Sequence, residues 1–97
     1  MKASIRARLE QLSERNEEVM ALLADSATIS DNDKFRKLSR EHAELEEITQ
    51  VWKAFCVAEA DLATAQEMRT DPEFKEIAEE EVSAAQQRIA ECAEQLN

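Results

Sequence analysis

The chain of 97 residues contains no glycine, and its only proline is Pro72. Glycine supplies most left-handed backbone turns, and proline breaks helices. A chain with almost neither has few means of forming hairpins or tight loops, so the sequence predicts an all-α fold with very few connections. Phosphate-binding loops and nucleophile elbows also need glycine, because the backbone there passes close to a ligand. We therefore expect any function to reside on helix surfaces.

The composition agrees with a single small helical domain spanning residues 1–97. Ala, Glu, Leu, Lys, Arg and Gln are abundant, as is typical of helical bundles and coiled coils. Only four residues are aromatic, so we expect a modest, mainly aliphatic core. No apolar stretch reaches the ~20 residues of a membrane-spanning helix. The N-terminus lacks the apolar run of a secretory signal, which favours a cytoplasmic protein.

The net charge of −10 is unevenly distributed along the chain. Residues 1–40 have a balance of +1, residues 41–70 of −5, and residues 71–97 of −6. A surface this acidic repels phosphate over most of its area, which disfavours general nucleic-acid binding. The exception is a group of four cations within seven residues: Lys34, Arg36, Lys37 and Arg40. They form either a solvated helix face or a contact patch for an anionic partner.

Residues that could support catalysis or metal binding are few and scattered. Cys56 and Cys92 belong to no Cys-x-x-Cys or Cys/His pattern, so we expect two small buried apolar residues; a disulfide stays open, although the compartment disfavours it. His42 is the only histidine, and we expect it half-buried and paired with a carboxylate. Glu79, Glu80 and Glu81 form a solvated face. We expect no catalytic residue, no cofactor and no metal site.

The apolar periodicity predicts three helices, at about residues 3–24, 33–69 and 72–96. The first has a coiled-coil seam with alternating steps of four and three residues, at Ile5, Leu9, Leu12, Asn16, Val19 and Leu23. Asn16 is polar, so it either fixes the register of the seam or lies at its edge.

Turn and capping residues fill the connection from Asp25 to Asp33. Either Ser30 with Asp33, or Asp31 alone, can cap the next helix. We expect Ile29 to pack against Phe35 or Leu38 and so fix the entry of that helix.

The second helix shows no clear stop before Thr70. Its predicted seam comprises Phe35, Leu38, His42, Leu45, Ile48, Trp52, Phe55 or Cys56, Leu62 and Met68. Alanines at positions 58, 60, 63 and 65 favour helix and leave room for close packing. Asp71 is expected to cap the third helix, with Pro72 at its first position. That helix is expected to bury Phe74, Ile77, Val82, Ala85, Ile89, Cys92 and Leu96.

Helices of these lengths span roughly 33, 55 and 38 Å. Short connections make sequential helices antiparallel. The first and third helices should then cover opposite halves of the second and overlap near residues 44–55, where large apolar residues are densest. The sequence thus predicts an elongated, coiled-coil-like antiparallel three-helix bundle with a long central helix and a buried Trp52. A break of the central helix among residues 56–60 is the main alternative.

Three segments together match a known pattern. The first is the opening, residues 1–10, with positions 17–23 after it. The second, residues 35–45, reads Phe-Arg-Lys-Leu-Ser-Arg-Glu-His-Ala-Glu-Leu and is similar to a Phe-Arg-x-Leu-Ser-[Arg/Lys]-Glu-[Tyr/His]-Ala-x-Leu motif. The third is Asp71-Pro72-Glu73, followed by an acidic helix. Over essentially the whole chain, these segments resemble the N-terminal domain of bacterial class I peptide chain release factors. The opening residues resemble the factor reading UAA and UAG more than its UGA-reading paralogue.

The resemblance implies that the chain is the N-terminal fragment of a longer translation termination factor. Family members carry a hydrolytic Gly-Gly-Gln loop and a codon-reading Pro-x-Thr tripeptide, and this chain has neither. The resemblance therefore implies a non-catalytic domain. Its parent protein would enter the ribosome, recognise UAA or UAG and trigger hydrolysis of peptidyl-tRNA. Asn97 is expected to be a boundary within that longer protein, although the sequence alone leaves a natural end open.

The resemblance further implies that this domain lies near the ribosomal stalk base and communicates with the class II release-factor GTPase. We expect Lys34, Arg36, Lys37 and Arg40 to face the stalk base, and the domain alone to be a monomer. We expect no membrane or small-molecule partner. The alternative is a stand-alone coiled-coil interaction module that dimerises through an exposed apolar face.

Overall fold

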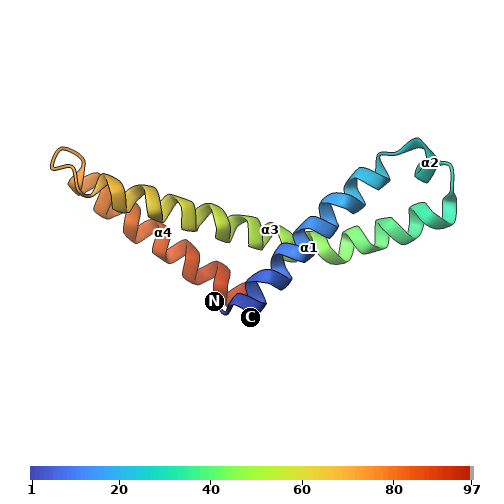
Figure 1. The fold of residues 1–97 in the computed structure, drawn as a ribbon, viewed down its shortest axis with the longest axis horizontal. Helices are drawn as coiled ribbons and strands as arrows, with labels where there is room; N and C mark the ends of the chain where they lie inside the picture. Colours follow the sequence, from blue (N-terminus) through green and yellow to red (C-terminus); the bar gives the residue numbers. More distant parts are fainter. Residues whose placement is uncertain (97) are drawn as a thin grey trace. The chain divides into compact units, whose positions relative to one another are not determined.

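The computed structural model describes residues 1–96. Asn97, the expected boundary, lies outside the described residues. The chain forms α1 (Ala3–Leu23), α2 (Ser26–Ile29), α3 (Asn32–Met68) and α4 (Lys75–Leu96) (Figure 1). Residues 1–96 contain no strand, which confirms the all-α fold class. None of these residues has a positive φ, as expected for connections built without glycine.

Helix α3 is continuous over 37 residues. The alternative prediction of a break among residues 56–60 is therefore wrong. The alanines explain part of this continuity, because alanine has the highest intrinsic helix propensity. Ala58 and Ala65 also pack in the core, each 2% exposed, whereas Ala60 and Ala63 face solvent.

The connection between α1 and α3 contains a short helix, α2, that was not predicted from the sequence. Asp25 has an extended backbone, and its carboxylate accepts a hydrogen bond from the amide of Ala27 at 3.0 Å, which starts α2. Thr28 is the buried residue of this turn, at 1% exposed. Ile29 is 54% exposed, so its predicted role as a packing residue at the entry of α3 is wrong.

Helix α4 begins at Lys75, three residues later than predicted. Asp71 does not cap α4 as predicted. Its carboxylate accepts a hydrogen bond from the backbone amide of Glu73 at 3.0 Å, and its carbonyl accepts one from the backbone amide of Phe74 at 3.1 Å. These bonds close a separate turn that contains Pro72, so the proline precedes the helix. Phe74 is 42% exposed, which contradicts its predicted burial.

The chain divides into two compact units, Met1–Gln50 and Val51–Asn97. In the first unit, α1 packs antiparallel to the first part of α3 (Figure 1). The buried apolar residues of this unit are Leu9, Val19 and Leu38. Asn16 is 3% exposed and contacts Thr49 of α3.

In the second unit, the remainder of α3 packs antiparallel to α4 (Figure 1). Its core is dominated by small residues around one aromatic pair: Trp52, Phe55, Ala58, Ala65, Ala78, Val82 and Ala85. The rings of Trp52 and Phe55 stack with centroids 5.6 Å apart. Trp52 is 4% exposed, which confirms its predicted burial. That α1 and α4 both cover residues 44–55 stays a prediction.

Candidate functional site

The basic group comprises Lys34, Arg36, Lys37 and Arg40, in the first turns of α3. The helix begins here because Asp31 supplies the cap: its carboxylate accepts from the amide of Lys34 at 3.2 Å, and its carbonyl accepts from the amide of Phe35 at 2.9 Å. This confirms one of the two predicted capping arrangements. Ser30 does not take part, because its hydroxyl donates to the Ala27 carbonyl instead.

All four cations of the basic group are exposed. Leu38, in the middle of the group, is 6% exposed and marks the face of α3 that packs against the rest of the unit. With 3.6 residues per turn, Arg36 and Arg40 each lie about 160° from Leu38, and Lys37 lies about 100° from it. Three of the four cations therefore share a solvent-facing side of the helix.

Within residues 1–96, no side chain of the basic group forms an ion pair. The nearby carboxylate of Glu41 is bound by Arg15 of α1, with Nε–Oε2 at 2.5 Å and Nη2–Oε1 at 2.8 Å. This hydrogen bonding lowers the pKa of Glu41, and the charge of Lys37 adds a smaller contribution. The same contact raises the pKa of Arg15. Because Glu41 is held by α1, the cations remain available for an external anion.

A polar network crosses the interface between α1 and α3. The amide nitrogen of Asn16 donates to the hydroxyl of Thr49 at 3.2 Å, and Asn16 Oδ1 lies 3.0 Å from Nδ1 of His42. His42 Nε2 lies 3.4 Å from a carboxylate oxygen of Glu46, and the imidazole is partly exposed. The predicted half-buried histidine beside a carboxylate is confirmed. Thr49, which is 2% exposed, was not singled out from the sequence, because the predicted seam passes through the neighbouring apolar residue Ile48.

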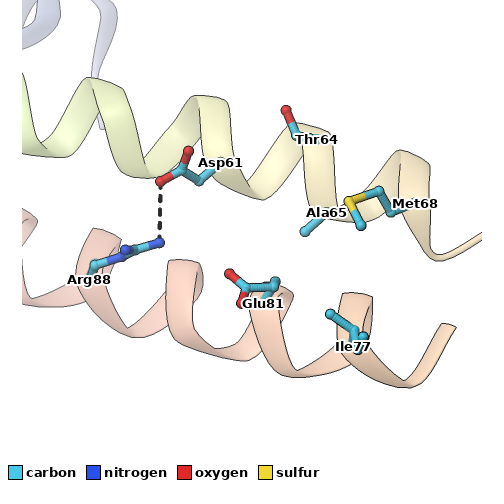
Figure 2. Close-up of a pocket in the computed structure, with 7 residues that line it drawn as sticks. All are labelled: Asp61, Thr64, Ala65, Met68, Ile77, Glu81 and Arg88. Atoms are coloured by element: carbon cyan, nitrogen blue, oxygen red, sulfur yellow. Dashed lines mark hydrogen bonds and ion pairs between the residues drawn. The ribbon is translucent and has the colours of Figure 1, made fainter. Parts of the chain in front are cut away.

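An open groove lies between α3 and α4 in the second unit, with a cavity volume of about 380 Å³. Figure 2 shows the seven side chains that line it: Asp61, Thr64, Ala65, Met68, Ile77, Glu81 and Arg88. No pattern in the sequence indicated this groove. Ile77 was predicted to be buried, but its side chain is 56% exposed.

Neither Cys56 nor Cys92 forms a disulfide in the described part of the chain, and both are partly exposed rather than fully buried as predicted. In the part of the chain that the structure describes, no three His, Cys, Asp or Glu residues are grouped so that they could hold a metal ion. None of the helices formed by residues 1–96 combines the length and apolar character that a bilayer crossing requires.

Comparison with known proteins gives one family. The PCRF domain family matches residues 12–97, a range that includes the basic group, the α1–α3 polar network and the groove. The match excludes residues 1–11, which contain the opening segment on which the resemblance to a UAA- and UAG-reading factor mainly depends. No solved structure matches the chain.

Proposed function

Because this chain belongs to the PCRF domain family, the N-terminal domain of class I peptide chain release factors, we propose that it is a docking module of a factor reading UAA and UAG. The PCRF domain belongs to a release factor involved in translation termination, and such factors associate with the ribosome. It is distinct from the catalytic domain that carries Gly-Gly-Gln. Its contribution to termination is therefore binding and positioning.

In this proposal the basic group contacts an anionic surface of the ribosomal stalk base. The observation that supports it is that all four cations are exposed on α3 and that none forms an ion pair within residues 1–96. The position of Lys34 supports the same reading. A cation in the first turn of a helix opposes the helix dipole, so Lys34 does not stabilise α3.

The rest of the surface limits where such docking can occur. The remaining residues bring the net charge of the chain to −10, which repels phosphate elsewhere. Contacts with ribosomal RNA are therefore confined to the basic group. The proposal also includes that the release factor acts in the cytoplasm and that this domain communicates with the class II release-factor GTPase.

The contact is tested in the full-length release factor by reversing the four charges together, with Lys34→Glu, Arg36→Glu, Lys37→Glu and Arg40→Glu. We expect the dissociation constant for ribosomes stopped at UAA to rise by about tenfold or more, because up to four phosphate contacts are lost. The salt dependence of binding, as the slope of log K against log salt, should become shallower by up to about 3. Thermal unfolding should be almost unchanged, since exposed substitutions usually have effects within about 0.5 kcal/mol.

A matched control reverses four other exposed cations: Arg8, Lys53, Arg69 and Lys75. It changes the net charge by the same amount. Equal weakening by both variants would reject the basic group as the contact, and so would recruitment at the wild-type level. The codon assignment is tested separately, by peptide release at UAA, UAG and UGA. Release at UGA would contradict that assignment without affecting the docking proposal.

A further inference from the structure

The acidic groove, defined by the seven residues of Figure 2, combines acidic side chains with apolar ones, of which Ile77 is 56% exposed. Ile77 and Glu81 rise from α4 toward α3 (Figure 2), four residues apart and thus on one face of the helix. Met68 lies beside them, at the end of α3. Val57, on the same face of α3 as Asp61 and one turn earlier, is 59% exposed.

The charges within the groove are only partly paired. Arg88 reaches Asp61 at 3.4 Å, as Figure 2 shows. Glu81 has no hydrogen bond or ion pair with any residue that the structure describes. Its carboxylate is exposed and lies in the groove with the apolar side chains of Ile77 and Met68, so it is accessible to a cation of a partner.

The surrounding surface selects the class of partner. The second unit holds eleven acidic and four basic residues, a balance of −7. Nucleic acid would be repelled, and a second copy of this chain would bring a net charge of −10 towards the groove. A basic segment of another protein has the complementary charge. Since two antiparallel helices form the groove, a third helix can lie along it.

We propose that the acidic groove binds a basic amphipathic helix of a protein partner. Apolar side chains of that helix contact Ile77 and Met68, and a lysine or arginine pairs with Glu81. This inference goes beyond the proposed stalk-base contact and does not depend on it, because it concerns the other unit and a partner of opposite charge.

The probe is a fluorescent synthetic helix of leucine and lysine with leucines at i, i+3, i+4 and i+7, titrated with the full-length release factor. We expect saturable binding by fluorescence anisotropy. Binding should weaken about tenfold with Ile77→Asp, which removes the apolar contact, and by a similar factor with Glu81→Lys, which removes the ion pair. A peptide with glutamate in place of lysine should not bind the wild-type protein.

Two control variants separate the groove from general attraction to an acidic protein. Glu79→Lys makes the same charge change on α4, about 160° around the helix from Glu81. Ile29→Asp changes an isoleucine of similar exposure in the first unit, at 54%. Both should bind the peptide almost as the wild type does.

Several outcomes would overturn the proposal. One is equal weakening by Glu79→Lys and Glu81→Lys, which would show non-specific charge attraction. Another is binding unchanged by Ile77→Asp, or no saturable binding at all. If Ile77→Asp disturbs folding, Glu81→Lys decides the matter, since a peptide with glutamate at one central lysine position should then regain affinity. Failure to regain it would count against the ion pair.

Discussion

Asn16 shows how one polar residue can define the pairing of two helices. Thr49 donates its hydroxyl hydrogen to the Leu45 carbonyl at 2.8 Å, so it accepts from the amide nitrogen of Asn16. The amide oxygen of Asn16 then faces His42, whose Nδ1 donates to it. Sliding α1 by one turn would leave this buried amide unpaired, at a cost of about 1–3 kcal/mol. Of the two alternatives open from sequence, register-fixing is the one that the burial of Asn16 supports.

The Arg15–Glu41 contact predicts a pH dependence of folding. The pKa of Glu41 is lowered in the folded state by its hydrogen bonds to Arg15. The contribution to stability is therefore fully present above the ordinary pKa of a glutamate, and it is lost as the pH falls through the lowered value. We expect the free energies of unfolding of the wild type and Glu41→Gln to differ at neutral pH and to converge in acid.

Urea unfolding at a series of pH values measures this difference. The matched control is Glu44→Gln, an exposed position on the same helix that forms no ion pair with the described residues. The free energy of unfolding of Glu44→Gln, plotted against pH, should run parallel to that of the wild type. A Glu41→Gln curve that did the same would show that the contact with Arg15 does not stabilise the fold, as is true of many exposed ion pairs.

At the scale of the helices, close packing in the second unit depends on alanine. Ala78 and Ala85 of α4 are 0% exposed, and Ala58 and Ala65 of α3 are nearly as buried. Small side chains let the two helix backbones approach closely. The bulk of this core then comes from Trp52, Phe55 and Val82.

Enlarging one of these alanines should therefore destabilise the unit. We expect Ala85→Leu to lower the free energy of unfolding by about 1–3 kcal/mol, since added methylene groups force side chains and backbone apart. The adjacent Ala84 is exposed, so Ala84→Leu should change it by no more than about 0.5 kcal/mol. Chemical denaturation measures both, and equal effects would contradict the close packing of α4 on α3.

The helices were predictable where the signal was local. The absence of glycine indicated long helices, and the seam residues Leu9, Val19 and Leu38 are buried as their spacing predicted. The predictions were wrong where local hydrogen bonds of a side chain determine the residue at which a helix begins. Asp25 forms a cap that starts α2, and Asp71 closes a turn before α4 begins.

The two candidate sites also differ in how far the sequence alone could predict them. The basic group could be found from sequence, because its four cations are close together in the chain and their exposure follows from helical spacing. The acidic groove could not. It requires Asp61 and Arg88 to face each other across two helices, and that pairing depends on how α3 and α4 are aligned, which periodicity does not specify.

For the whole molecule, charge separates two kinds of surface. The first unit carries eight basic and eleven acidic residues, a balance of −3 with a local cationic cluster, whereas the second carries −7. Two partners of opposite charge can therefore bind one chain without competing for the same residues. Each proposed contact can be removed by substitutions that leave the other intact.

The same charge argues against the rival view of a self-associating coiled-coil module. Two copies brought together carry −20 in total, and exposed apolar residues such as Val57 and Ile77 sit among carboxylates. We expect sedimentation equilibrium of the 97-residue chain to give a mass near 11.0 kDa at every loading concentration. Salt screens repulsion, so measurement at about 0.5 M salt is the more demanding condition. A mass that rises with concentration at either salt level would revive dimerisation, and Val57→Asp would then show whether the apolar face of α3 mediates it.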